Sequence, residues 1–313
     1  MNRKKIHKRI PKPLKDLTLL DRFLFDTAVS DPEICHNILS IIFGGREILA
    51  LRIGVSEYSV EPYYDARAIR LDLLAFDAEG SVYNAEAQKE NRGYDALCRR
   101  SRFYQAHIDV NLLEPGEVDF GKLNDVYVIF ISPFDIFGKG KYQYTFRMKC
   151  DEVPDLELED GAVRIFLNTK GQNTEEVSPE LIEFLKYAEK NTEDESALKC
   201  PRVRKLADQI NQIKQNQEVG VRYMRQWEEV EYARRDGRTE GLERGLEQGL
   251  TLGEMVILVK LVRKKKRKNL NINEIADFLE EDESKIRTIY ELLNSYPDST
   301  DNELAEILCD QNV

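Results

Sequence analysis

The stretch that decides the fold reads IRLDLLAFDAEGSVYNAEAQ and occupies positions 69–88. Two apolar runs flank an Asp-Ala-Glu-Gly turn, which is a pattern typical of a β-hairpin. Side chains alternate between the two faces of a strand, so Asn84, Glu86 and Gln88 share one face of the second strand. Pairing around the turn brings Asp72 to the same end of the hairpin as Glu86 and Gln88. We therefore predict two paired strands that carry carboxylates at one end.

The carboxylates of this hairpin suit a divalent metal ion. Hydrolysis of a phosphodiester needs a metal that neutralises the phosphate and lowers the pKa of a bound water. Oxygen ligands favour Mg²⁺ or Mn²⁺, and Asp72, Glu86 and the backbone carbonyl of Ala87 provide three of them. The alternative is that both acids are only exposed positions of a one-sided sheet. The chain has three histidines and five scattered cysteines without a Cys-x-x-Cys pair, so histidine or cysteine chemistry is disfavoured.

Gln88 occupies the position where sites of this kind usually have a lysine. Its amide can orient a water molecule and donate a hydrogen bond to developing charge, but it brings no positive charge and is a poor base. The next residue, Lys89, points to the opposite face if the strand stays regular.

A helix is predicted over residues 94–110, and it carries the positive charge that Gln88 lacks. Arg99 and Arg102 are three positions apart and share one face of this helix. These two arginines, together with Arg100 and the neighbouring Tyr104, are the candidate contacts to phosphate or DNA.

The surrounding pattern predicts a mixed α/β sheet. Two helices are expected within residues 17–43, the second starting with a capping box formed by Ser30 and Glu33. Residues 46–64 read as a ragged strand. Residues 124–132 are almost continuously apolar, which indicates a central strand buried on both faces. Further strands are expected over residues 142–148 and 163–167, with a helix over 179–190.

The second half of the chain is predicted to be helical. Apolar residues at helical spacing from Val203 onward, resumed by Met224 and Trp227, indicate one long amphipathic helix. A strict four-residue repeat then places glycines at positions 237, 241, 245, 249 and 253. Because glycine weakens a helix, the repeat favours close approach of a second helix, and we expect a homodimer through residues 203–255. The alternative is a marginal, solvated helix stabilised by Glu–Arg pairs.

Charge and composition bound the remaining interpretation. Residues 1–15 hold seven Lys/Arg and no acid, which predicts a flexible tail or a phosphate-contacting arm. Six consecutive bases occupy positions 263–268, before a tail of small helices. The net charge is −11, which gives no sign of nucleic-acid binding by the chain as a whole. No apolar run is long enough to cross a bilayer, so we expect no membrane association, and cytoplasmic localisation is expected from the cysteine pattern.

The sequence resembles the Rpn-like recombination-promoting nucleases, which are also described as PD-(D/E)XK nuclease family transposases. The motifs that carry the resemblance are Arg-Leu-Asp72, Asn84-Ala-Glu86-Ala-Gln88, Arg100-Ser-Arg102-Phe-Tyr104 and the apolar strand at 127–132. The resemblance covers residues 16–170 well and the rest loosely. It implies a restriction-endonuclease-like core over residues 16–195, followed by a helical glycine-repeat region (196–262) and a basic run with a small helical tail (263–313).

The function implied by this resemblance is metal-dependent cleavage of DNA in recombination or mobile-element biology. It places Asp72, Glu86 and Gln88 at the three catalytic motif positions and makes Mg²⁺ the cofactor. Asp21 matches an acidic position of the family and is a possible distant contributor, whereas Asp26 stands where a lysine is often found and receives no role. The alternative is a decayed nuclease core that serves as a DNA-binding or oligomeric scaffold.

Overall fold

The computed structural model describes residues 10–44, 52–53, 71–113, 116–190 and 197–310. Two expected segments lie largely outside the described residues. The first is residues 1–9 of the expected basic tail. The second is the ragged strand expected over 46–64, of which only residues 52 and 53 are described. The chain divides into two compact units, Met1–Arg225 and Gln226–Val313, and each is described by itself.

The first unit contains a six-stranded mixed sheet in the order β1-β2-β3-β4-β6-β5. Its strands are β1 (Arg52–Ile53), β2 (Leu73–Phe76), β3 (Val82–Ala87), β4 (Val126–Ser132), β5 (Gln143–Phe146) and β6 (Ala162–Asn168). The β3–β4 and β4–β6 pairs are parallel, and the other pairs are antiparallel. The predicted mixed α/β core is therefore confirmed.

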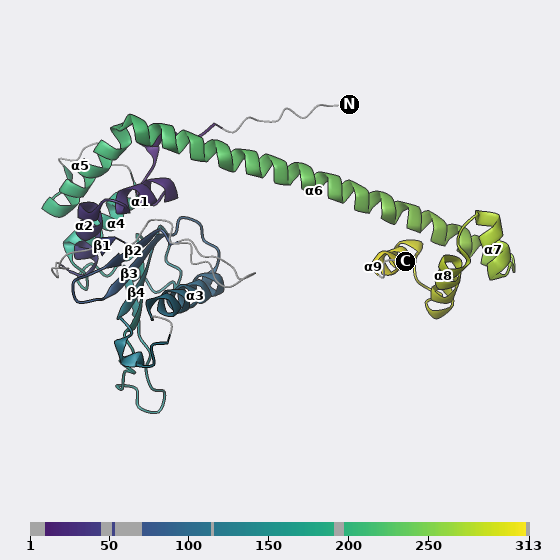
Figure 1. Ribbon diagram of the computed structural model, residues 1–313, viewed down its shortest axis with the longest axis horizontal. Coiled ribbons are helices and arrows are strands. Elements are labelled where there is room, and N and C mark those ends of the chain that lie inside the picture. The colour runs from purple at the N-terminus through teal and green to yellow at the C-terminus, as the bar shows by residue number, and fades with distance from the viewer. Residues whose placement is uncertain (1–9, 45–51, 54–70, 114–115, 191–196, 311–313) are drawn as a thin grey trace. The chain divides into compact units, whose positions relative to one another are not determined.

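Helices cover both faces of this sheet (Figure 1). On one face, α1 (Arg22–Val29), α2 (Pro32–Ile42), α4 (Pro179–Glu189) and α5 (Pro201–Gln215) share an apolar core with the sheet. On the other face, α3 (Tyr94–Leu112) packs through Leu97 and Ile108 on a smaller apolar cluster. Strand β4 contributes Ile129 and Ile131 to the first core and Val128 and Phe130 to the second, so the predicted central strand is confirmed.

The start of α2 differs from the predicted capping box. Asp31, and not Ser30, is the N-cap residue, and its carboxylate accepts hydrogen bonds from the backbone N–H groups of Glu33 and Ile34. Pro32 follows at the first helical position, where its fixed φ is compatible with the helix and its missing N–H is not needed. An Asp side chain directly before Pro therefore sets the helix start one residue later than the Ser30 pattern indicates.

The long amphipathic helix expected from Val203 is interrupted at Asn216. This residue separates α5 from α6 (Gln217–Lys266), and its side-chain oxygen accepts hydrogen bonds from the N–H groups of Glu218 and Val219. Four buried residues attach α5 to the core of the first unit: Val203, Leu206, Ala207 and Ile210. The boundary between the units, after Arg225, lies inside the predicted region 196–262.

The second unit has its own apolar core. The end of α6 packs with α7 (Ile272–Leu279), α8 (Glu283–Ser295) and α9 (Asp301–Asp310). Capping boxes begin α7 and α9, because Asn271 and Glu274 exchange hydrogen bonds, as do Thr300 and Glu303. Within the described ranges, no helix is long and apolar enough to cross a membrane.

Half of the basic run at positions 263–268 contacts the second unit's own helices. Arg263 donates a 2.7 Å hydrogen bond to Asp301 and another to the carbonyl of Ser299. The ammonium of Lys265 lies 3.0 Å from the centre of the Phe278 ring, and that of Lys266 lies 4.7 Å from the Tyr290 ring. These three cations therefore stabilise the small helical tail through ion-pair and cation–π contacts.

Candidate active site

The hairpin of β2 and β3 holds Asp72 against Glu86. Leu73 pairs with Ala85, so the residues that precede Leu73 and follow Ala85 lie opposite each other. The backbone N–H of Asp72 donates a 3.0 Å hydrogen bond to Glu86 Oε1, and the N–H of Ala87 donates a 3.3 Å bond to Asp72 Oδ2. Asp72 is 5 % exposed and Glu86 is 4 % exposed. Each carboxylate is thus fixed by the backbone of the opposite strand.

The pKa values of Asp72 and Glu86 are both raised above their ordinary values. Burial raises the pKa of Glu86, and the negative charge of Asp72 raises it further, against hydrogen bonds from Asp72 N–H and Asn84. Burial also raises the pKa of Asp72, against the positive charges of Arg22 and Arg100 and the N–H of Ala87. Paired buried carboxylates with raised pKa values form a typical environment for a bound cation, which favours the ionised forms.

Asn84 supports Glu86 from the same face of β3. Its side-chain nitrogen donates a 2.9 Å hydrogen bond to the carbonyl of Leu73 and a 3.2 Å bond to Glu86 Oε1. The side chain is fully buried. The alternation of the strand places Asn84 beside Glu86, but no motif around Asn84 indicates a supporting role. We infer that Asn84 fixes the orientation of the Glu86 carboxylate.

Gln88 is joined to Arg100 of α3. The side-chain nitrogen of Gln88 donates to the carbonyl of Glu90, and its oxygen accepts a hydrogen bond from Arg100 Nη2. The guanidinium carbon of Arg100 lies 5.0 Å from the centre of the Phe130 ring and 5.5 Å from that of Tyr104. The positive charge expected from the arginine helix is therefore held next to Gln88.

One cleft of about 1130 Å³ within the first unit is lined by Asp72, Glu86, Gln88 and Arg100. The four candidate DNA contacts of α3 all line it: Arg99, Arg100, Arg102 and Tyr104. So do three cations that sequence analysis did not place there: Arg22, Lys89 and Arg92. The cleft combines a carboxylate pair with several cations, which suits a polyanion bound next to a metal ion.

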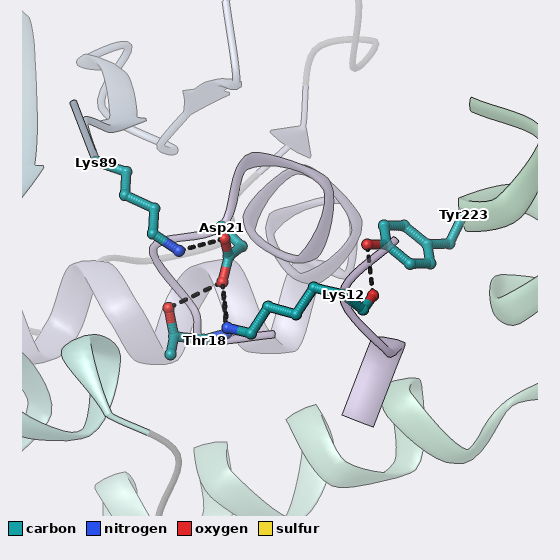
Figure 2. Close-up of polar contacts among 5 residues, drawn as sticks. All are labelled: Lys12, Thr18, Asp21, Lys89 and Tyr223. Atoms are coloured by element: carbon teal, nitrogen blue, oxygen red, sulfur yellow. Dashed lines mark hydrogen bonds and ion pairs between the residues drawn. The ribbon is translucent and has the colours of Figure 1, made fainter. Parts of the chain in front are cut away.

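Asp21 does not line the cleft, and it acts as a junction between segments (Figure 2). Its carboxylate accepts hydrogen bonds from the N–H and hydroxyl of Thr18, at 2.8 and 3.1 Å. It also pairs with Lys89 and, at 3.4 Å, with Lys12, whose carbonyl accepts a 2.7 Å hydrogen bond from Tyr223. Burial acts to raise the pKa of Asp21, but the bonds from Lys89 and Thr18 outweigh burial and lower the pKa.

The position of Lys89 depends on where β3 ends. The expectation that Lys89 faces away from the site assumed a regular strand, but β3 ends at Ala87. Beyond this end the side chain of Lys89 reaches Asp21 and also lines the cleft. Lys89 therefore lies closer to the site than the alternation of a strand predicts.

Arg22 is the residue that sequence reasoning missed most clearly. Its Nη2 lies 3.4 Å from Asp72 Oδ1, and its Nε lies 3.7 Å from Asp26. Asp26 also interacts with Asp72, and this interaction lowers the pKa of Asp72. Arg22 and Asp26 lie on α1, about fifty positions before the hairpin, so no local pattern connects them with Asp72. The apolar face of α1, through Leu24, Phe25, Ala28 and Val29, is what brings them there.

The oxygen atoms of Asp72, Glu86 and the Ala87 carbonyl fit a small divalent cation that also binds waters and substrate phosphates. Among the residues that the structure describes, no group of three or more His, Cys, Asp or Glu side chains is placed to hold a metal. Mg²⁺ does not need such a group, because it is usually bound by one or two carboxylates together with waters and substrate phosphates. Asp72 and Glu86 would supply the carboxylates for such an ion, and Ala87, which lines the same cleft, would supply a carbonyl.

Glu86→Gln is expected to stabilise the metal-free protein at pH 7 by about 1 kcal/mol or more, because the wild-type carboxylate must take up a proton on folding and the glutamine does not. The pKa of Glu86 is raised in the fold above its ordinary value of 4.5. Wild-type stability therefore falls, relative to the variant, as the pH rises above that value. Urea denaturation in EDTA from pH 4 to pH 8 measures the difference, with exposed Glu229→Gln as the control. A variant no more stable than wild type at pH 7 would contradict the electrostatic account.

Comparison with known proteins identifies one protein family. The model of the PD-(D/E)XK nuclease family transposases matches residues 22–236, which include the hairpin, α3, the whole sheet and the first part of α6. Searches among curated proteins and among solved structures each found no match.

Proposed function

Because the chain belongs to the PD-(D/E)XK nuclease family transposases, we propose that it is a metal-dependent DNA endonuclease that hydrolyses phosphodiester bonds. The family itself establishes a function related to nucleases and transposases. The observation that supports metal-dependent cleavage is the pair of buried carboxylates, Asp72 and Glu86. Each accepts a hydrogen bond from a backbone N–H of the opposite strand, and the Gln88–Arg100 pair lies next to them.

The residues of the cleft divide the work of hydrolysis. Asp72, Glu86 and the carbonyl of Ala87 would hold Mg²⁺ or Mn²⁺. The bound ion would neutralise the scissile phosphate and lower the pKa of the attacking water. Gln88 orients that water with the free hydrogen-bonding capacity of its amide. Arg100 fixes the amide of Gln88 and adds the positive charge that stabilises the transition state.

DNA is the proposed partner of the cleft. Arg99 and Arg102 are exposed on α3, and with Tyr104 they provide contacts along the phosphate backbone. Asp21 contributes at a distance, because it holds Lys89 at the edge of the same cleft. The transposase description of the family supports a link to recombination or mobile-element activity. All five cysteines are free thiols, which fits action in the reducing cytoplasm.

Incubation of the purified protein with supercoiled plasmid and Mg²⁺ tests the proposed activity. Nicked or linear DNA should form with Mg²⁺ or Mn²⁺ and should not form in EDTA. The competing proposal, a decayed nuclease core that serves as a DNA-binding or oligomeric scaffold, is favoured by glutamine in the lysine position. That alternative would be adopted if no DNA were cut and neither Mg²⁺ nor Mn²⁺ raised the melting temperature.

We also propose that the protein is a homodimer joined, within residues 203–255, through α6, because the apolar face of α5 is buried in the core of the first unit. Leu242, Leu246 and Leu250 follow the glycine repeat on α6 and are 74 %, 64 % and 61 % exposed. A Cβ added at any of the five repeat glycines would meet no atom within 4 Å. A bare glycine row beside exposed leucines would let a second α6 approach closely and cover the leucines.

Leu246→Glu in the full chain is expected to convert this dimer into a monomer, because it places a charge in the middle of the apolar row. Light scattering after size-exclusion chromatography measures the mass. The matched control is Gln248→Glu, which adds the same charge about half a helical turn away. A dimer that survives Leu246→Glu, or a wild-type monomer, would remove this interface.

A further inference from the structure

Arg22 forms an ion pair with the Oδ1 oxygen of Asp72. Neither the sequence nor the family match assigns Arg22 a role. We propose that Arg22 is an exchangeable counter-ion of the site. It neutralises Asp72 while no metal is bound, and it is displaced by a divalent cation and becomes available to a DNA phosphate. This inference rests on the proposed metal site at Asp72 and Glu86.

The contact between Arg22 and Asp72 has the geometry of an exchangeable pair. A single guanidinium nitrogen lies 3.4 Å from one carboxylate oxygen, so the pair is neither bidentate nor closely hydrogen-bonded. The side chain of Arg22 is 56 % exposed, whereas that of Asp72 is 4 % exposed. An ion pair with one partner in solvent is weak, so a divalent ion can replace it. Arg22 contacts Asp72 Oδ1, whereas the N–H of Ala87 donates its hydrogen bond to the other oxygen, Oδ2.

Arg100 provides the contrast within the same cleft. It donates to Gln88, and its guanidinium lies against the rings of Phe130 and Tyr104. These contacts involve neither Asp72 nor Glu86, so we expect Arg100 to stay in place when a metal binds. The site therefore has one fixed arginine and one that only two long ion pairs restrain, to Asp72 at 3.4 Å and to Asp26 at 3.7 Å.

The backbone under Arg22 is fixed, so that only its side chain has to move. Asp21, the preceding residue, is tied to Thr18, Lys12 and Lys89 (Figure 2). The following turn buries Leu24 and Phe25 in the core of the first unit. Displacement then requires a rotamer change of an exposed side chain, which is fast and has a low energetic cost.

Charge balance sets the direction of the exchange. Without metal, the carboxylates of Asp72 and Glu86 face the positive charges of Arg22 and Arg100, and Asp26 is a third carboxylate beside Arg22. A divalent cation at Asp72 supplies two further charges and repels Arg22, and a DNA phosphate next to it attracts Arg22. Arg22 and the divalent cation compete for the same carboxylate, so each weakens the binding of the other by the same factor. Removal of the Arg22 charge should therefore strengthen metal binding.

Titration calorimetry with Mn²⁺, in the absence of DNA, tests this exchange. Arg22→Gln should bind Mn²⁺ about tenfold more tightly than wild type, which is the lower end of what a neighbouring opposite charge does to a carboxylate. Arg22→Met keeps an apolar stem and should behave in the same way, and Arg22→Lys keeps the charge and should restore wild-type affinity. The matched control is Arg92→Gln, which removes a cleft arginine that pairs with Glu90 and should leave the affinity unchanged.

Binding of DNA in Ca²⁺ tests the second half of the proposal. The salt dependence of binding should fall by about 0.9 in log–log slope for Arg22→Gln, which corresponds to one lost phosphate contact. In EDTA the slope of the variant should match that of wild type. Equal Mn²⁺ affinity for wild type and both neutral variants, or an unchanged slope in Ca²⁺, would overturn the role of Arg22 and leave the metal site in place. Absence of Mn²⁺ binding by wild type would overturn both.

Discussion

Asp72→Asn is expected to lower Mg²⁺-dependent DNA cleavage by about 10³-fold or more, because loss of a metal ligand removes several kcal/mol of transition-state stabilisation. The asparagine oxygen can still accept the hydrogen bond from Ala87 N–H, so the hairpin should keep its register. The effect should therefore come from the missing charge and not from unfolding. Single-turnover cleavage of supercoiled plasmid measures the rate.

The matched control for Asp72→Asn is Asp95→Asn. Asp95 is an exposed carboxylate in the first turn of α3, and it does not line the cleft. Its loss changes the net charge of the protein by the same amount and should leave the rate within about twofold, as expected of a surface substitution. Equal cleavage by Asp72→Asn and wild type would remove Asp72 from the catalytic site.

Arg100→Gln is expected to lower the cleavage rate by about 10²-fold, in the range found when one preorganised donor to a transition state is removed. Arg100 both holds the oxygen of Gln88 and supplies the nearest fixed positive charge. Arg147→Gln is the control, because Arg147 is exposed and does not line the cleft. Cleavage at the wild-type rate by Arg100→Gln would contradict the role given to this arginine.

A second substitution at position 88 tests whether Gln88 and Arg100 act as a unit. Gln88→Lys alone places an ammonium next to Arg100 and should lower the rate through like-charge repulsion. The double variant Gln88→Lys with Arg100→Gln restores one cation at the site and should cleave faster than either single variant. Additive losses would show that the two residues act independently.

The hairpin and its neighbours could be predicted because their signals are local. The turn after Phe76 sets the register of β2 and β3, and strict alternation then places Asn84, Glu86 and Gln88 on one face. The apolar run of β4 is long enough to indicate a strand buried on both sides. These features depend on residues adjacent in sequence, so the sequence alone determines them.

The contacts around the carboxylates could not be predicted, because they depend on tertiary packing. Nothing in the sequence connects Arg22 with Asp72, or Asp21 with Lys89, across more than forty residues. Even near the hairpin, the placement of Lys89 required knowing that β3 ends at Ala87. The break at Asn216 was missed for a different reason, because an N-cap residue interrupted a helix whose apolar phase continued.

The central claim is that Asp72 and Glu86 bind a divalent metal, and anomalous diffraction from crystals soaked in Mn²⁺ tests it most directly. The account predicts one strong anomalous peak at about 2.2 Å from a carboxylate oxygen of each residue, a typical distance for such ions. Crystals of Asp72→Asn should lose that peak. A peak that touches neither carboxylate, or no peak in the wild-type cleft, would contradict the claim.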